Sequence, residues 1–293
     1  MTDYRDRLRV KPGSKVRLKD VDPGYHGDGV TTADAAAMVA AYERQLELGQ
    51  LKLYAESRRS LLIVLQGLDA SGKDGVCRHV LDAFNPLGTT VSAFKQPTPA
   101  ELAHDFLWRV HARAPGKGEV AVFNRSHYED VLVVRVHGLV PRKVWSRRYE
   151  QINEFERQLG ASGTTILKFF LYISKDEQLE RFRDRLEDPR RNWKISLGDY
   201  EERSHWDEYI EAYEEALERC STDDAPWYVI PSNRKWFRDL AVSQILCATL
   251  EDMDLRYPEP SVDLEEVRRQ YHLAATGDGG RKKVKPGKGR PER

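Results

Sequence analysis

The chain has 293 residues and a formal net charge of zero, with 40% hydrophobic and 32% charged residues. This composition is typical of a soluble globular enzyme, and the length favours one α/β domain with helical additions while also admitting two domains. No run approaches the roughly 18 apolar residues that cross a membrane. Zero net charge gives no indication of a polyanionic partner, so any polyanion site must come from local clustering of charge.

The cysteines and the N-terminus indicate the compartment. Cys77, Cys220 and Cys247 are far apart and form no CxxC pair or zinc-like spacing. Sparse thiols are typical of a reducing compartment, and the charged start MTDYRDRLRVKPGSK lacks the apolar core of a signal peptide. We therefore expect a cytoplasmic protein without a membrane partner.

The first elements in chain order are an arm, a helix and a strand. Residues 1–30 are rich in charge, glycine and proline, which predicts an irregular arm. Residues 31–57 repeat apolar side chains at helical spacing, with Thr31, Thr32 or Asp34 as the candidate N-cap. The apolar run SLLIVLQG, residues 60–67, then predicts a buried parallel strand.

Further strands and helices alternate along the rest of the chain. Such alternation favours an α/β fold, a parallel sheet covered by helices on both faces. The expected strands are residues 90–95, 119–124, 164–173 and 227–231, and the expected helices are 73–84, 99–112, 128–137, 142–159, 175–186, 199–219 and 234–253.

The segment GLDASGKD, residues 67–74, is the strongest chemical signal. It follows a predicted strand and opens a predicted helix, which is the setting of a phosphate-binding loop. Gly67 and Gly72 would let the backbone N–H groups of the loop, including Ala70 and Ser71, turn toward phosphate. Lys73 would add a positive charge. The alternative is an ordinary glycine-rich turn.

Two acids distinguish this loop from its common form. Asp69 lies inside the loop, where a carboxylate is repelled by phosphate unless a cation lies between them, so it is a candidate Mg²⁺ ligand or phosphate positioner. It could instead bond its own turn backbone. Asp74 replaces the usual Ser or Thr after the lysine; in the first helical turn an acid is also favourable without any ligand.

The segment FNRSHYEDVL, residues 123–132, follows another predicted strand. Ligands of parallel α/β sheets lie beyond the carboxyl ends of the strands, where Asn124, Arg125, Glu129 and Asp130 are expected. Arg125 can contact phosphate through two N–H groups, and the acids could contact a nucleotide or a metal. Alternatively, they cap the helix that begins nearby.

The segment RFRDRLEDPRRNWKIS, residues 181–196, is strongly basic and broken by Pro189. A basic helix end followed by a turn is typical of a lid that covers phosphates and excludes water. Alone, such a charge run is more often a solvated surface. Its proximity to a phosphate loop favours the lid, with Arg185, Arg190, Arg191 and Lys194 on phosphate.

The C-terminal segment GDGGRKKVKPGKGRPER, from about residue 277, is basic and almost free of apolar residues. This composition predicts disorder. It would serve as a solubilising tail or as an arm that gathers polyanions.

Together, GLDASGKD, FNRSHYEDVL and DPRRNWK resemble the motifs of the family-2 polyphosphate kinases, over about residues 40–255. The resemblance implies a three-layer P-loop kinase fold with a helical lid, use of Mg²⁺, and phosphoryl transfer between inorganic polyphosphate and nucleotides. It implies a homo-oligomer, a dimer or a tetramer. The HYEDVL continuation resembles the subgroup that phosphorylates both AMP and ADP, with adenine nucleotides expected and guanine nucleotides as a second option.

The family's catalytic positions can be carried over residue by residue. Its loop acid and lysine fall on Asp69 and Lys73, its second motif on Asn124 and Arg125, and its lid arginine on Arg185. Asn124 stands where some members carry Asp, which leaves the metal ligands open. The expected organisation is an arm and helix over residues 1–57, a kinase domain over 58–257 with a lid at about 181–198, and an extension over 258–293.

Three other functions remain open from the residues. An ATP-dependent kinase of a nucleoside monophosphate or another small metabolite would use the same loop and lid. A nucleic-acid-binding P-loop protein would use the basic tail, although no aromatic-basic recognition motif accompanies it. The third, a catalytically silent assembly protein, is disfavoured by Lys73 and the basic lid.

Overall fold

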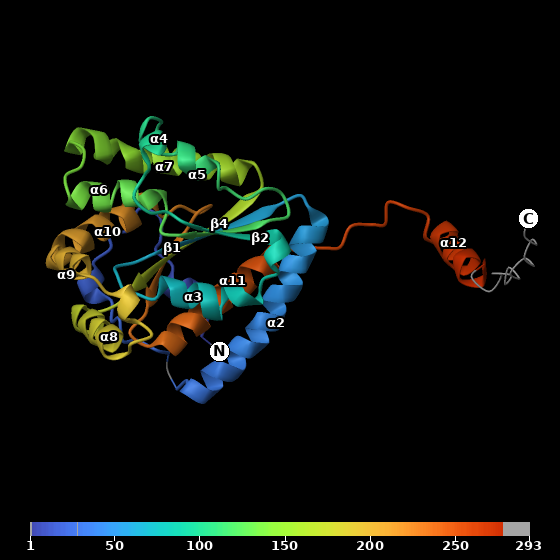
Figure 1. Ribbon diagram of the computed structural model, residues 1–293, viewed down its shortest axis with the longest axis horizontal. Coiled ribbons are helices and arrows are strands. Elements are labelled where there is room, and N and C mark those ends of the chain that lie inside the picture. Colours follow the sequence, from blue (N-terminus) through green and yellow to red (C-terminus); the bar gives the residue numbers. More distant parts are fainter. Residues whose placement is uncertain (1, 28, 278–293) are drawn as a thin grey trace, which may run out of the picture. The chain divides into compact units, whose positions relative to one another are not determined.

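A parallel five-stranded sheet forms the centre of the computed structural model, which describes residues 2–27 and 29–277 (Figure 1). Its strand order is β2 (Thr89–Ala93), β3 (Val120–Asn124), β1 (Ser60–Gln66), β4 (Thr164–Tyr172) and β5 (Trp227–Pro231). All five predicted strands are confirmed. Leu65 of β1 pairs with Asn124 of β3, so the phosphate loop and the second motif leave the sheet side by side.

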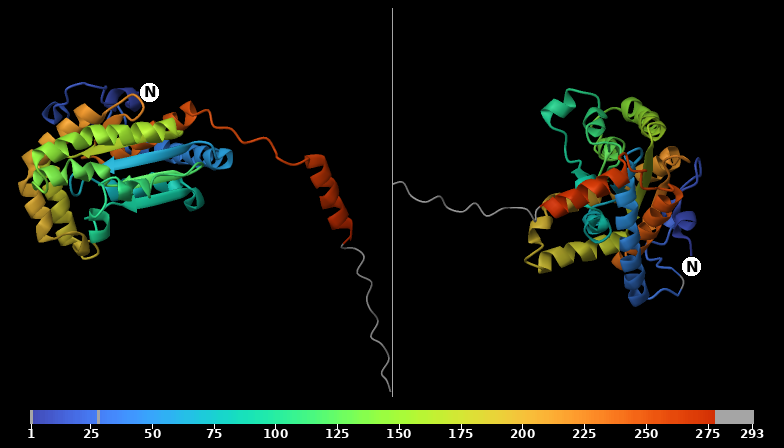
Figure 2. Two further views of the ribbon diagram at one scale, coloured as in Figure 1. Left: turned by 90° about the horizontal axis from the view of Figure 1, so that it is seen from above. Right: turned by 90° about the vertical axis from the view of Figure 1, so that its right-hand side faces the viewer.

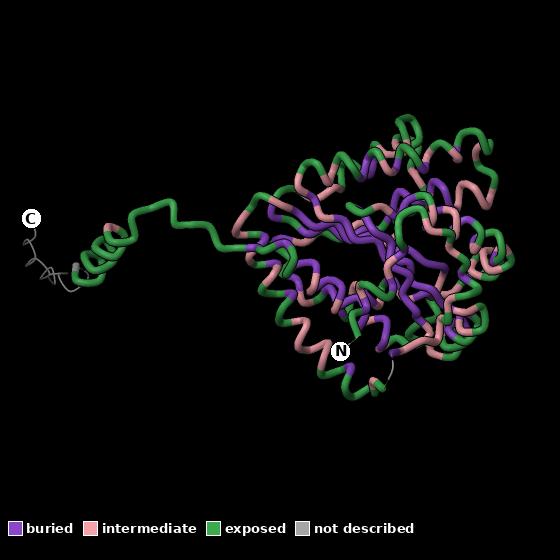
Figure 3. The backbone as a smooth tube through the Cα atoms, turned by 180° about the vertical axis from the view of Figure 1, so that it is seen from behind, coloured by how far each residue is buried: buried purple, intermediate pink, exposed green. Residues whose placement is uncertain are grey.

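Helices cover both faces of the sheet (Figure 2). Side chains alternate along a strand, so Leu62 and Val64 of β1 enter one apolar cluster, while Leu61 and Ile63 enter the other. The first cluster includes α7 (Arg142–Ala161) and α10 (Trp206–Cys220), and the second includes α2 (Thr32–Glu56), α3 (Lys73–His79) and α11 (Lys235–Asp252). The buried strands between them stand out in Figure 3. This arrangement confirms the predicted α/β fold.

Several predicted helices are shorter or divided. The helix expected over 73–84 ends at His79, and the 3₁₀ turn Leu81–Ala83 follows. The remaining divisions give α4 (Pro99–Leu102) and α5 (Trp108–His111), the 3₁₀ helix η4 (His127–Asp130) and α6 (Val133–Val136), and α9 (Leu197–Ser204) before α10.

Local side-chain bonds explain one of these divisions. Thr98 and Glu101 form a capping box that starts α4, and the Asp105 carboxylate accepts the Leu107 N–H before α5 begins. Such bonds give the backbone an alternative to a continuous helix. By contrast, α2 begins as predicted. Thr31 is its N-cap, and the Asp34 carboxylate in turn accepts the Thr31 backbone N–H.

The N-terminal arm is more ordered than its composition predicts. It contains α1 (Tyr4–Leu8) and the 3₁₀ turn η1 (Leu18–Asp20), and the N–H of Val10 donates to the Trp227 carbonyl at 2.8 Å. Tyr4 and Leu18 are fully buried. The apolar side chains between the charges thus anchor the arm to the core.

The remaining elements belong to the lid region and to the C-terminal part. α8 (Lys175–Glu187) is followed by the 3₁₀ turn η5 (Asn192–Lys194), and a further 3₁₀ turn spans Pro86–Gly88. The chain up to Arg256 forms one compact unit, and α12 (Leu264–Gly277) lies in a second unit. The predicted disordered tail falls almost wholly on residues 278–293, outside the described residues. None of the helices described in residues 2–27 and 29–277 has the length and apolar character to span a membrane.

Candidate functional site

The phosphate loop between β1 and α3 has a backbone that its glycines permit. Gly67 has φ +153°, and a Cβ there would lie 2.6 Å from the Ser71 Oγ and 2.7 Å from the Leu171 carbonyl oxygen. Gly72 has φ +108°, and Ala70 between them has φ +63°, in the left-handed region. Strained backbone of this kind gathers at ligand-binding loops.

Lys73 begins α3 and folds back over the loop. Its ammonium donates to the carbonyl oxygens of Gly67 at 2.6 Å and Leu68 at 3.2 Å, and the residue is 8% exposed. Burial, aided by the nearby cation Arg125, lowers the pKa of Lys73 to about 8, although Asp69, Glu129 and Asp74 oppose the shift. The positive charge of Lys73 therefore lies directly beside the phosphate loop.

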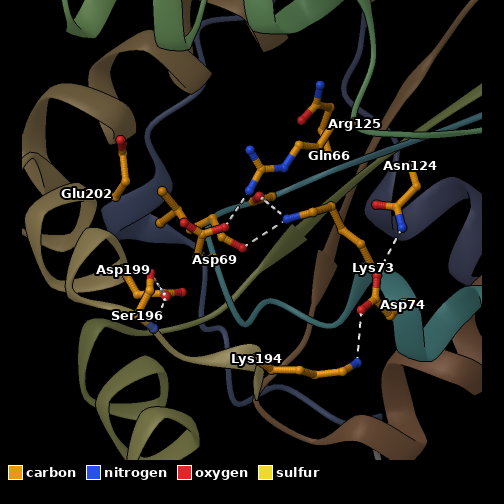
Figure 4. Close-up of polar contacts among 12 residues, drawn as sticks. Gln66, Asp69, Lys73, Asp74, Asn124, Arg125, Lys194, Ser196, Asp199 and Glu202 are labelled. Carbon is orange, nitrogen blue, oxygen red and sulfur yellow. Dashed lines mark hydrogen bonds and ion pairs between the residues drawn. The ribbon is translucent and has the colours of Figure 1, made fainter. Parts of the chain in front are cut away.

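Asp69 and Arg125 form an ion pair across the site. The Arg125 Nη2 donates to the Asp69 Oδ1 at 2.6 Å, and Figure 4 shows both side chains meeting near Lys73. Arg125 follows β3 directly, has φ +59°, and donates its backbone N–H to the Leu65 carbonyl at 3.0 Å. The pairing of β3 with β1 thus brings the second motif to the phosphate loop.

Asp74 joins the loop to the lid. Its carboxylate accepts from the Asn124 Nδ2 at 3.0 Å and from the Lys194 Nζ at 3.2 Å (Figure 4). Residues from three distant segments therefore meet at the first turn of α3. The charge of Asp74 has a structural partner here in addition to any role toward phosphate.

The basic side chains of the lid segment have different surroundings. The Arg185 Nη1 donates to the Lys194 carbonyl at 3.0 Å and lies 3.4 Å from the Asp199 Oδ1. Arg190 and Arg191 pair with Asp188 and expose 88% and 53% of their side chains. Arg181 is buried and turns toward the backbone of the phosphate loop instead of joining this group.

A cavity of about 1450 Å³ collects most of the predicted residues. Eleven of them line it: Asp69, Ala70, Gly72, Lys73, Asp74, Asn124, Arg125, Arg185, Arg190, Arg191 and Lys194. Trp193 of the lid segment lines the same cavity. Gly67, Ser71, Glu129 and Asp130 are outside the lining. The sequence reasoning missed the wall from α11, with Lys235, Trp236, Arg238 and Asp239, which carries no motif.

Glu129 and Asp130 lie in η4, outside the cavity lining. Glu129 is partly exposed, and burial raises its pKa against the opposing charges of Arg125 and Lys73. Asp130 pairs with Arg148 of α7 at 2.8 Å, and burial raises its pKa to about 6. Glu129 therefore interacts electrostatically with Arg125 and Lys73 from outside the cavity lining, whereas Asp130 pairs with Arg148 of α7.

The carboxylate of Asp69 is the candidate ligand for a divalent cation. It lines the cavity, and oxygen is the ligand type that Mg²⁺ prefers. Within residues 2–27 and 29–277, no group of three or more His, Cys, Asp or Glu side chains is placed to hold a metal. This donor set fits a cation that is held by one or two carboxylates, substrate phosphates and water.

The pKa of Lys73 predicts how anion binding depends on pH. Pyrophosphate affinity should fall as pH rises through about 8, because Lys73 is cationic below that pH and neutral above it. Calorimetric titration without nucleotide would measure the affinity on both sides of this pH. Lys73→Ala should bind more weakly and lose the pH step. A flat profile in the unmodified protein would contradict this assignment.

Known proteins resemble this chain over most of its length. The family model described as polyphosphate kinase 2 matches residues 31–258. An AMP/ADP-polyphosphate phosphotransferase of Meiothermus ruber is 51% identical over 265 residues, which are 89% of this chain and 98% of the relative. An ADP-polyphosphate phosphotransferase of Rhodopseudomonas palustris is 44% identical over 284 residues, 90% of this chain and 97% of the relative.

A solved structure agrees with these relatives. The crystal structure of polyphosphate kinase 2 from Arthrobacter aurescens TC1 superposes with a TM-score of 0.89 and 43% identity, over 92% of this chain and 97% of that chain. The similarity therefore spans the sheet, the phosphate loop and the lid segment together.

Proposed function

Because the chain belongs to the polyphosphate kinase 2 family, we propose that it transfers phosphoryl groups reversibly between inorganic polyphosphate and AMP or ADP, forming ADP and ATP. The observation that carries this proposal is that the phosphate loop and the cations of the lid line the same cavity. A row of cations suits a chain of phosphates better than it suits a base.

We assign roles by position around the cavity. Lys73, Arg125 and Arg185 would stabilise the charge of the transferring phosphoryl group, with Asp69 as the fourth catalytic residue. The proposed phosphate-binding set in the cavity lining is Ala70, Gly72, Lys73, Asp74, Arg190, Arg191 and Lys194, with Gly67 and Ser71 shaping the loop from outside the lining. Asn124 and Arg125 of the proposed nucleotide-binding set line the cavity, whereas Glu129 and Asp130 of that set lie outside its lining. The lid would include residues 181–198 and close over these phosphates.

Positioning and charge neutralisation account for the chemistry. One phosphoanhydride bond breaks and another forms, so the reaction is nearly isoenergetic and needs no covalent enzyme intermediate. The protein must align the acceptor phosphate, offset negative charge and exclude water. Asp69 would hold Mg²⁺, which supplies positive charge to the phosphate oxygens when bound. We also propose a cytoplasmic homo-oligomer.

The test is a donor experiment. Polyphosphate, Mg²⁺ and AMP or ADP are incubated with the protein, and the nucleotides are separated by chromatography. The proposal expects ADP and ATP from AMP, and ATP from ADP. If AMP stays unchanged while ADP reacts, the claim for AMP fails. If ATP alone serves as donor, the protein is a kinase of a small metabolite.

Glu129 should influence the choice of acceptor. Glu129→Ala should lower AMP use relative to ADP use by about tenfold, the size of one lost interaction with a charged group. The reason is its place behind Arg125 in the segment that resembles AMP-accepting members. Steady-state rates with each acceptor would measure the ratio, with Glu150→Ala on the exposed side of α7 as the control. An unchanged ratio would remove Glu129 from acceptor selection.

A further inference from the structure

α8, the helix that leads into the lid, holds three consecutive carbonyl groups of the phosphate loop. The Gln178 Nε2 donates to the Asp69 carbonyl at 2.9 Å. The Arg181 Nη1 donates to the carbonyl oxygens of Ala70 at 2.8 Å and Ser71 at 3.0 Å. Gln178 and Arg181 are almost fully buried residues, at 2% and 6% exposure.

The remaining donors of Arg181 are also engaged. Its Nη2 bonds the carbonyl oxygens of Ser232 and Asn233, just beyond β5, and its Nε donates to the Glu177 carboxylate at 2.7 Å. One planar guanidinium thus ties the phosphate loop to the end of β5. A lysine could not reproduce this geometry, because its single ammonium offers three donors at one point.

These carbonyl bonds fix the direction of the neighbouring N–H groups. In a trans peptide, the C=O and the next N–H point to opposite sides. Holding the carbonyls of Asp69 and Ser71 against α8 therefore turns the N–H groups of Ala70 and Gly72 away from α8. The Ser71 N–H already donates to the Leu68 carbonyl at 3.1 Å, so the loop keeps its own turn.

We propose that Gln178 and Arg181 are positioning residues that orient the N–H groups of the phosphate loop toward phosphate. This inference rests on the proposed function. It means that the first two turns of α8 hold the phosphate loop in a fixed position. Gln178, Arg181 and Arg185 lie at helical spacing on one face, so the same helix sets both the loop and the lid arginine. The part of the lid that is free to move then begins after Arg185, close to the end of α8 at Glu187 and the following Pro189.

The key variant is Arg181→Lys, which keeps the positive charge but removes the planar guanidinium with its several directed N–H donors. It should lower kcat by about tenfold or more, the cost of losing hydrogen bonds from a charged group, and weaken pyrophosphate binding by a similar factor. The nucleotide KM should change less than kcat. Arg181→Ala should recover part of its kcat when guanidinium is added at concentrations that leave the unmodified enzyme folded.

Gln178→Met is the second variant, because it conserves volume and removes one bond to the loop. It should weaken pyrophosphate binding without added nucleotide. Arg183→Ala is the matched control: this arginine of the same helix exposes 59% of its side chain and pairs with Glu180. It should keep both pyrophosphate affinity and kcat.

Thermal unfolding of each variant separates positioning from folding. The inference is overturned if Arg181→Lys and Gln178→Met bind pyrophosphate normally, or if lost activity follows lost stability and guanidinium restores nothing. Pyrophosphate binding is measured without turnover, so it distinguishes this failure from failure of the proposed function. In the latter case, the unmodified enzyme would bind pyrophosphate but use no polyphosphate.

Discussion

Lys73→Ala should reduce turnover by about a hundredfold or more, the loss typical of removing one preorganised charge from an active site. The Lys73 ammonium lies at the loop carbonyls of Gly67 and Leu68, in the cavity that the lid cations share. Phosphate would draw it from these neutral oxygens to anionic ones. Initial rates of ATP formation from ADP and polyphosphate would measure the loss.

A matched lysine controls for the general effect of losing a charge. Lys117 is exposed and precedes β3, at the end of the sheet opposite the phosphate loop, so Lys117→Ala should retain the normal rate. Circular dichroism would confirm that Lys73→Ala is folded. A folded Lys73→Ala enzyme with a near-normal rate would remove the lysine from the catalytic set.

Asp69→Asn should reduce turnover by a similar factor, but it should also change how the rate depends on Mg²⁺. The substitution keeps the shape of the side chain but removes the charge that pairs with Arg125 and that would hold the metal. Turnover should fall about a hundredfold, and the Mg²⁺ concentration for half-maximal rate should rise. The rate as a function of Mg²⁺ would show both effects.

The control for this variant is an acid outside the cavity. Asp82 is exposed in the turn after α3, and Asp82→Asn should leave the rate and its Mg²⁺ dependence unchanged. Unaltered Mg²⁺ dependence in Asp69→Asn, with turnover still lost, would reassign Asp69 to holding Arg125. Normal turnover would remove it from the catalytic residues.

The strands and the loop could be predicted because their signals are local. The run at β1 is apolar throughout since both faces are buried, and the glycine at its end marks the turn. The adjacency of the two motifs follows from β3 pairing with β1, which the sequence alone leaves undetermined. The divided helices were missed because capping bonds such as that of Thr98 compete with periodicity only locally.

The site could be predicted only in part, because the sequence shows which side chains are charged but not which groups they contact in the fold. Arg181 and Arg185 read alike, yet one is bonded to the loop backbone and the other reaches the lid. Arg238 of α11 is distant in sequence and carries no motif. In the fold it packs so closely that a Cβ on Gly72 would lie 2.1 Å from its Nη1. Such contacts depend on how the helices cover the sheet.

The measurement that tests the central claim most directly uses polyphosphate labelled with radioactive phosphorus. Unlabelled AMP and Mg²⁺ are added with no other donor, and the nucleotides are separated and counted. We expect label first in the β-phosphate of ADP and then in the γ-phosphate of ATP, and neither product with Lys73→Ala. A parallel reaction contains γ-labelled ATP and a small acceptor in place of polyphosphate. If the nucleotides stay unlabelled in the first reaction while ATP transfers its γ-phosphate in the second, the protein is not a polyphosphate-dependent kinase.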